Sequence, residues 1–519
     1  MRRLFLALSF ACLAMAQEAA DPPSRAARLS YINGTVSFQP GGVDDWVPAE
    51  PNRPLTTGDR LWTEEGSRAE LNFGSAAFRL NSRTNFTFLN LDDKAAQIQL
   101  SLGTLSIRLR RLADDETIEI DTPQAAFPLL RPGDYRIDVN EAGDATIATV
   151  RGGDAEATAS GQSFPIHARE QVRITGVEGT EPVFDRRPAP PTDPFDNFCQ
   201  DRDRREDLST SGKYVSRDIP GYADLDANGT WRTDPQYGAV WVPSTVPVGW
   251  SPYRYGHWAW IAPWGWTWVD DAPWGYAPFH YGRWAFVAGS WVWVPGPIGP
   301  RPVYAPAMVA YVGGAGFGVG VVGWFPLGPR EVFVPAYGVS AVYMTRVNVT
   351  NTVVTEVAVR NVYANRAVPG AVVAVRGEAI VGGRPIAAEA VRVPPAAIER
   401  AEVIRAAPVA PERAAVLGGR APLAGPHLPP AAVVNRPVVS RITPPAAVHV
   451  NVRPANVPVN AAPSVNRVEA APPNNRPNAT PAAASTPRPE TASSSHEERA
   501  PQKKTSKPAK KTTRSEKDR

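Results

Sequence analysis

The chain has 519 residues, of which 43% are hydrophobic and 20% charged, so it is long enough for more than one folded domain. It contains two cysteines, and only Cys199 lies beyond the first sixteen residues, which excludes a scaffold held by internal disulfides. The charge is uneven: residues 17–345 carry 28 Lys and Arg against 39 Asp and Glu, whereas residues 346–519 carry 25 against 12.

The first sixteen residues have the three parts of a secretory signal peptide. Met1-Arg2-Arg3 is basic, Leu4–Leu13 is a mainly apolar stretch of ten residues, and Ala14-Met15-Ala16 fits a cleavage site. Ten residues are too few to span a bilayer, and no later stretch has eighteen uninterrupted apolar residues. We therefore expect an exported mature chain without a transmembrane helix, located in the periplasm or associated with the outer membrane or cell surface.

Residues 25–178 are predicted to form a β-domain. The segment ARLSYINGTVSFQP alternates apolar and polar residues around an Asn33-Gly34 turn signal. Further short alternating runs follow, and in AAQIQLSLGTLSIRLRRL the period of two is interrupted at Gly103. Short strands at this spacing favour a β-sandwich or roll over a parallel α/β sheet.

Part of this β-domain resembles the exported FecR-like domain. The resemblance rests on a Gly-Asp turn, a Thr, a Gly-Ser pair and a strand ending in Leu, followed by two later landmarks: Gly58-Asp59, Thr63, Gly66-Ser67, Leu80, Leu102-Gly103-Thr104-Leu105 and Asp121-Thr122-Pro123. The best-known members form the periplasmic half of an inner-membrane signalling protein. This sequence shows neither the cytoplasmic anti-sigma segment nor the membrane helix of those members. The resemblance therefore implies a β-fold and an exported binding or scaffolding role.

Residues 179–221 are predicted to be a linker with one short helix. Thr192 or Asp193 would cap this helix, and Pro194 would occupy its first position. Cys199 lies among aspartates, which disfavour a thiolate, so we expect a buried structural thiol rather than a nucleophile.

The segment GYADLDANGTW is similar to the first half of a calcium loop. Asp224, Asp226 and Asn228 have the right spacing, but the twelfth position is Pro235 instead of the glutamate that binds calcium with both oxygens. We therefore favour a strand, an Asn228-Gly229 turn and a second strand containing Trp231.

Residues 222–349 are predicted to form a Trp-rich domain of β-hairpin repeats. The segment 249–258 realigns with 275–284 at an offset of 26 residues, which indicates stacked supersecondary units. Trp264, Trp266 and Trp268 alternate along one strand and so share one face. We expect this face to be mostly buried, against Trp258, Trp260 and the strand of Trp291 and Trp293.

The same region resembles an exported Trp-rich family of unknown function, with repeats similar to YXWGXW and WXXGXW. The resemblance is carried by five short motifs: Trp266-Thr267-Trp268-Val269, Pro273-Trp274-Gly275, His280-Tyr281-Gly282-Arg283-Trp284, Trp291-Val292-Trp293-Val294-Pro295-Gly296 and Gly323-Trp324-Phe325-Pro326-Leu327-Gly328-Pro329. It implies no activity, because that family has none assigned.

The polar and aromatic residues around the repeats are the candidate ligand-binding residues. Tyr255 and Tyr281 precede glycines and are predicted to be more exposed than the indoles, which would suit the apolar faces of sugars. The basic neighbours of these tyrosines complete the candidate set: Arg254, His257, His280 and Arg283. Each histidine is replaced by arginine in the other repeat, so we expect no metal site and no cofactor.

The sequence favours a non-catalytic binding or scaffolding protein of the cell envelope, with a cell-wall or capsular glycan as partner. No catalytic residues are predicted, because no hydrolase motif occurs and Asp270 and Asp271 are adjacent rather than facing each other. The alternatives are a secreted hydrolase of envelope polysaccharide and a periplasmic component of a FecR-like signalling system.

The last part of the chain is predicted to be poorly ordered. Residues 350–410 are expected to be a partly ordered extended segment, because VNVTNTVVTEVAVRNVYANR alternates in the manner of a strand. Residues 411–519, rich in Pro, Ala and Val and then in Lys, are expected to be a disordered basic tail. In an exported protein such a tail would meet an anionic envelope polymer or lipid surface rather than nucleic acid.

Overall fold

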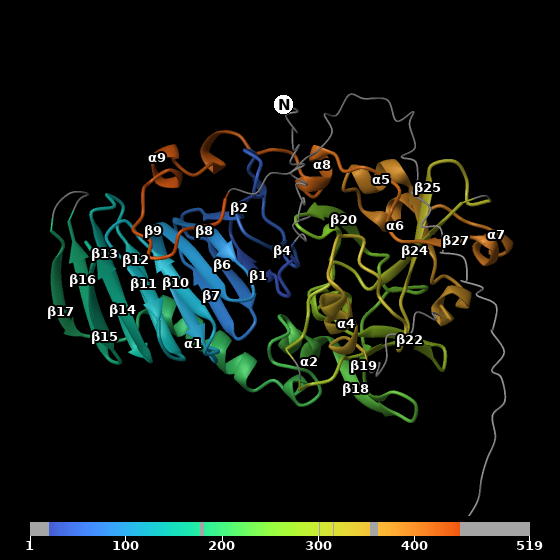
Figure 1. Ribbon diagram of the computed structural model, residues 1–519, viewed down its shortest axis with the longest axis horizontal. Helices are drawn as coiled ribbons and strands as arrows, with labels where there is room; N and C mark the ends of the chain where they lie inside the picture. The colour runs from blue at the N-terminus through green and yellow to red at the C-terminus, as the bar shows by residue number, and fades with distance from the viewer. Residues whose placement is uncertain (1–19, 177–180, 300, 315, 353–361, 447–519) are drawn as a thin grey trace, which may run out of the picture. The chain divides into compact units, whose positions relative to one another are not determined.

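The computed structural model describes residues 20–176, 181–299, 301–314, 316–352 and 362–446 (Figure 1). The described residues are mainly β, as predicted, and their strands belong to several sheets. None of the helices within these ranges is long and apolar enough to cross a membrane. The predicted signal peptide, residues 1–16, and the predicted tail beyond residue 446 lie outside the described residues.

Strands β1 to β17 form a β-sandwich of two layers that share β9 (Figure 1, blue to teal). The first layer consists, in order, of β4 (Pro54–Leu55), β1 (Ala27–Asn33), β6 (Arg68–Phe73), β7 (Ala76–Leu80), β9 (Ala95–Leu109), β12 (Gly133–Val139), β13 (Ala145–Gly152), β16 (Glu170–Thr175) and β17 (Val183–Pro188). The second consists of β3 (Val47–Pro48), β2 (Val36–Gln39), β5 (Arg60–Thr63), β8 (Thr84–Leu91), β9, β10 (Thr117–Asp121), β11 (Ala126–Leu129), β14 (Asp154–Ala159) and β15 (Gln162–His167). The inward-facing residues of both layers make one hydrophobic core, so the predicted sandwich is confirmed.

Gly103 marks the point where β9 leaves one layer and enters the other. Before it, β9 pairs with β8 and β10; from Gly103 onward, it pairs with β7 and β12. Gly103 has φ +97°, and a Cβ atom there would lie 2.4 Å from Oγ1 of Thr84. The predicted interruption is therefore a crossing within one continuous strand, which requires glycine at that position.

Helix α1 (Pro194–Asp207) begins as the sequence predicted. The side chain of Asp193 accepts from the backbone N–H groups of Phe195 and Asp196, and Asp196 completes a capping box. Cys199 is buried on this helix, as predicted, and burial raises the pKa of its thiol to about 11, so the thiolate is disfavoured.

Three short helices follow α1: η1 (Ser211–Lys213), η2 (Tyr222–Asp224) and α2 (Leu225–Asn228). The strand predicted before Asn228 is therefore wrong, since the chain is helical there. Asp224 forms an ion pair with the buried Arg28, and Asp226 accepts from the backbone N–H of Ser211 at 2.9 Å. These carboxylates serve the fold, because each is already engaged by a protein donor.

The Trp-rich region consists of four antiparallel β-hairpins. They are β18 (Gly229–Asp234) with β19 (Gly238–Pro243), β20 (Gly256–Ile261) with β21 (Gly265–Asp270), β22 (Arg283–Val287) with β23 (Ser290–Val294), and β24 (Val309–Gly313) with β25 (Val321–Pro326). The second and third hairpins are the two copies of the predicted repeat. The third is preceded by α3 (Ala277–His280).

The indoles of these hairpins pack mostly on one another. Trp258 lies opposite Trp268, and Trp260 opposite Trp266, so the predicted pairing of these strands is confirmed. The predicted contact with the strand of Trp291 and Trp293 is wrong, because β23 pairs with β19, where Trp293 lies opposite Trp241.

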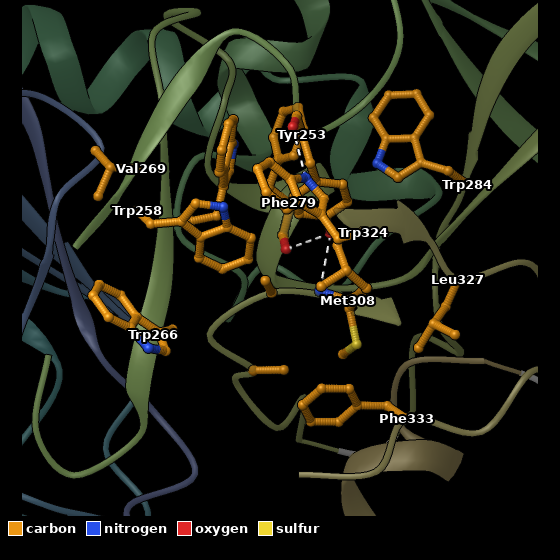
Figure 2. Packing of buried hydrophobic residues seen from close by; sticks show 14 of the residues in the cluster. Tyr253, Trp258, Trp266, Val269, Phe279, Trp284, Met308, Trp324, Leu327 and Phe333 are labelled. Carbon is orange, nitrogen blue, oxygen red and sulfur yellow. Dashed lines mark hydrogen bonds between the residues drawn. The ribbon is translucent and has the colours of Figure 1, made fainter. Parts of the chain in front are cut away.

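The centre of this core is Tyr253, which precedes β20 (Figure 2). Its hydroxyl donates to the carbonyl of Phe279 at 2.8 Å and accepts from the N–H of Met308 at 3.0 Å. The indole N–H of Trp324 donates to the Tyr253 carbonyl at 3.0 Å. Backbone partners thus satisfy the hydroxyl group of Tyr253 and the indole N–H of Trp324 inside this core.

The remaining described elements are short. They are α4 (Ala341–Val349), η3 (Ala364–Ala367), β26 (Val373–Arg376), α5 (Gly377–Val381), α6 (Ile386–Glu389), α7 (Pro395–Arg400), β27 (Glu402–Ile404), α8 (Arg413–Val416), η4 (Gly425–His427) and α9 (Ala431–Val434). Strands β26 and β27 extend the β24–β25 hairpin to four strands. The expectation of an extended segment after residue 350 is thus incomplete, because short helices alternate with these strands.

Residues 411–442, called the strap below, correct the predicted start of the disordered tail. Val433 packs with Trp46, Trp62 and Leu102 of the sandwich, and its carbonyl accepts from the Ser101 hydroxyl at 2.8 Å. The strap contains few aromatic residues of its own. It is nevertheless ordered, because the sandwich supplies the apolar rings and the hydrogen-bond donors that it contacts.

Candidate functional site

Four of the six predicted ligand-binding residues are buried: His257, His280, Tyr281 and Arg283. His280 is completely buried; its Nδ1 lies 2.9 Å from the carbonyl oxygen of Ala305, and burial lowers its pKa to about 3, so the imidazole is neutral. Tyr281 is 2% exposed, which contradicts its predicted exposure. The reason is that its ring packs against Tyr276 and Tyr304, both of them buried.

Arg283 is a structural arginine in the core. Its guanidinium donates to the carbonyl of Glu331 at 3.1 and 3.2 Å and to the side-chain oxygen of Asn348 at 3.1 Å. Burial lowers its pKa to about 10, so it stays charged near neutral pH. These oxygen acceptors surround the charge, so the arginine connects the loop of Glu331 and helix α4 to the start of β22.

His257 belongs to an ionic cluster and not to an open platform. Its Nε2 lies 3.3 Å from the carboxylate of Glu50, which Arg420 also contacts at 2.7 Å. Burial alone would raise the pKa of Glu50, but His257, Arg53 and Arg420 together lower it to about 2. This cluster joins the β3–β4 loop to β20 and to the strap.

Arg254 and Tyr255 remain half-buried. Arg254 lines a cavity of about 600 Å³, whereas Tyr281 lines a separate one of about 20 Å³. The structure therefore disperses the six candidates over the core, an ion cluster and two cavities, and it does not bring them together in a shared sugar platform.

A different set of aromatic residues surrounds a cavity of about 320 Å³, called the aromatic cleft below. Its walls come from the β20–β21 hairpin, β24, the loop at 333–337 and residues 405–409. The aromatic residues that line it are Trp260, Trp264, Trp266, Tyr311, Phe333 and Tyr337.

Trp260 and Tyr337 are half-buried, so they are the aromatic residues of the cleft that a ligand can reach most easily. Trp260 packs edge-to-face on Trp266 at 5.3 Å between ring centroids, and the Trp266 N–H donates to the carbonyl of Val409 at 3.2 Å. The exposed Arg405 donates to the carbonyls of Pro335 and Tyr337. The cleft thus combines apolar ring surface with a positive charge at its rim.

The lining of the aromatic cleft is mainly aromatic and aliphatic, and Arg405 is its single charged residue. No carboxylate, histidine or cysteine is among the residues that line the aromatic cleft. Asp270 on the neighbouring β21 is fully buried; burial raises its pKa well above the usual range, and its carboxyl accepts from the Trp268 indole at 2.9 Å. Throughout the described ranges, no three His, Cys, Asp or Glu residues are grouped so as to hold a metal ion.

Sequence reasoning missed Trp260 and Arg405 as candidate residues. Trp260 shows the same alternation as Trp258, and only packing separates the buried indole from the half-buried one. Arg405 and Val409 lie some 145 residues further along the chain, and no local pattern connects them with the hairpin.

Comparison with known proteins gives a family for one region. Residues 222–331 match DUF6600, a family of unknown function. Two crystal structures of a candidate anti-sigma factor from Parabacteroides distasonis are similar to 25% of this chain, with 12% and 13% identity and a TM-score of 0.23 for both. The similarity spans 60% of their length. No curated protein matches this sequence. The four described hairpins lie within the region that is similar to DUF6600.

Proposed function

We propose that this protein is a non-catalytic, exported component of the cell envelope that binds glycan chains at the aromatic cleft. The observation that carries the proposal is the half-buried Trp260 beside a cavity of about 320 Å³. The C–H faces of a sugar ring pack well on an indole, and burying apolar surface there stabilises the complex by about 25 cal/mol per Å².

The positive charge of Arg405 at the rim of the aromatic cleft indicates which glycans should bind best. Arg405 is exposed, and its guanidinium is fixed by two backbone carbonyls beside Tyr337. A fixed arginine favours carboxylate or phosphate groups, so we expect acidic cell-wall or capsular polysaccharides to bind better than neutral ones.

A hydrolase is the weaker alternative. Glycoside hydrolysis usually needs two carboxyl groups on either side of the scissile bond, and the residues lining the cleft supply none. Export is supported by the signal-peptide pattern of residues 1–16.

The FecR-like landmarks support a β-fold more directly than a signalling role. Asp59 accepts from the backbone N–H of Gly41 and of Thr56, both at 2.8 Å, and so fixes the turn before β5. Gly103 permits the crossing of β9 between layers. Both residues have structural reasons to be present, and we propose a signalling role only as the second candidate.

The test uses the mature chain and a panel of acidic and neutral envelope polysaccharides, with affinity measured by calorimetry and intrinsic fluorescence. Trp260→Ala should weaken binding at least about tenfold, which corresponds to about 1.4 kcal/mol. The matched control is Phe286→Ala, since Phe286 takes the place of Trp260 in the second repeat and is 41% exposed. Equal losses in the two variants, or no binding to any polysaccharide, would contradict the proposal.

A further inference from the structure

A second cavity, of about 600 Å³, lies beside strand β26 and shares no lining residue with the aromatic cleft. One wall is β26, the edge of its four-stranded sheet. The segment 390–393 runs beside this strand, since the N–H of Val391 donates to the carbonyl of Ala374 at 2.8 Å. Residues of helix α7 and of the η3 turn also line the cavity. The cavity is therefore a groove built by elements that are fixed to one another.

The walls of this groove are aliphatic. Val368, Val372, Val391, Val393 and Ile398 all line it, and all are half-buried although they pack against the main core of the DUF6600 region. Exposed apolar surface gathered in one concave place is unfavourable in water and is typical of a binding site.

Three arginines stand among these aliphatic residues. Arg254, Arg366 and Arg392 line the groove, together with a single carboxylate, that of Glu399. Among the described residues none of the three forms a salt bridge with any carboxylate. Arg366 is instead fixed by backbone carbonyls, including that of Ala401 at 2.7 Å.

Positive charge without a protein counter-ion beside an apolar wall defines the kind of ligand. An acidic head group would be held by the guanidinium groups, which match carboxylate and phosphate oxygens in pairs. An aliphatic chain attached to that head would cover the valines and Ile398. Neither a simple inorganic anion nor an uncharged hydrocarbon would satisfy both parts of the groove.

We propose that this groove, lined by Arg254, Arg366 and Arg392, binds a single anionic amphiphile: an acidic head group on an aliphatic chain. A fatty acid and a lysophospholipid share this chemistry. Arg254 is thus the one predicted binding residue that keeps a ligand-binding role, for a lipid-like molecule in place of a sugar. The inference uses none of the residues that line the aromatic cleft, so either proposal can fail without the other.

The experiment measures binding of palmitate, of a lysophospholipid with an acidic head, and of the uncharged monopalmitoyl glycerol to the full chain, by calorimetry below the micellar concentration. Palmitate should bind with one-to-one stoichiometry, and monopalmitoyl glycerol at least about tenfold more weakly. Comparable affinities for palmitate and the lysophospholipid would indicate that the groove recognises an acidic head group on an aliphatic chain, whichever acid it is. A clear preference for one of them would indicate whether the groove binds a carboxylate or a phosphate head group.

Two variants and one control separate this groove from general surface charge. Arg254→Gln and Arg392→Gln should each weaken palmitate binding by about tenfold while the melting temperature stays that of the wild type. The control is Arg376→Gln, because Arg376 is exposed at the end of β26 but does not line the groove. The proposal is overturned if Arg376→Gln has the same effect, if the uncharged analogue binds as tightly as palmitate, or if neither anionic ligand binds.

Discussion

Replacing Trp268 by alanine tests whether the indoles of the DUF6600 region form a core. Trp268 is completely buried, and its ring lies 5.5 Å from that of Trp258 and 5.8 Å from that of Tyr253. Its N–H donates to the carboxyl group of Asp270, which is itself fully buried. The substitution removes the ring and leaves one buried acceptor without its donor.

The structure sets the size of the expected effect. Truncating a buried Trp to Ala costs about 3–5 kcal/mol, and leaving a buried polar group unpaired adds about 1–3 kcal/mol. Domains are stable by only about 5–15 kcal/mol, so Trp268→Ala should bring this region close to unfolding. Trp260→Ala, on the opposite strand of the same hairpin, should cost much less, because Trp260 is half-buried.

Thermal denaturation followed by tryptophan fluorescence and near-UV circular dichroism measures both variants. At about 2–4 °C per kcal/mol, a loss of about 4–8 kcal/mol should lower the melting temperature of Trp268→Ala by about 8–32 °C. Trp268→Phe, which keeps an aromatic ring but loses the N–H, should fall between Trp268→Ala and the wild type. If Trp268→Ala and Trp260→Ala have equal melting temperatures, the assignment of Trp268 to the core and of Trp260 to the aromatic cleft is refuted.

Three further results are expected. The contribution of His280 to the unfolding free energy should fall by up to about 4–5 kcal/mol as pH drops from about 6.5 towards 3. The unfolded chain protonates His280 over this range, while burial keeps its folded pKa near 3. Urea titrations should therefore show that His280→Gln loses less stability than the wild type as pH drops. Val433→Asp should release the strap, since it places a charge among apolar rings, and limited proteolysis with mass spectrometry should then show cleavage within 411–446 that the wild type resists. Gly103→Ala should destabilise the sandwich by about 3 kcal/mol or more in chemical denaturation, whereas Gly161→Ala, also at positive φ but with open space around it, should cost only about 1 kcal/mol.

Features decided by neighbouring residues could be read from the sequence. The cap of α1 depends on Asp193 and Pro194, which are adjacent to the helix that they start. The two repeated hairpins follow from alternation and from glycines near the turns. Each depends on the geometry of a few consecutive residues, and that geometry is the same wherever the segment lies in the fold.

Features decided by distant residues could not be read in this way. Tyr281 looks exposed beside Gly282, but its burial depends on Tyr304, and Arg283 is enclosed by residues 331–348. The strap looked disordered because its own composition cannot form a core. Its order comes from rings and hydroxyls of the sandwich, nearly 400 residues earlier.

The strap has a consequence for how the protein reaches its folded state. It makes the sandwich a discontinuous domain, with the DUF6600 region as an insertion between the sandwich strands and their last packing segment. The Ser37 hydroxyl donates to the carbonyl of His427, a contact that spans 390 residues. Contacts between such distant residues form late, because closing a long loop costs entropy before any contact is gained. During synthesis, the faces of Trp46 and Trp62 that the strap covers therefore stay exposed until the chain beyond residue 433 has emerged. For that period the nascent sandwich exposes an aromatic surface that can aggregate. We expect a chaperone that binds aromatic surface to protect it.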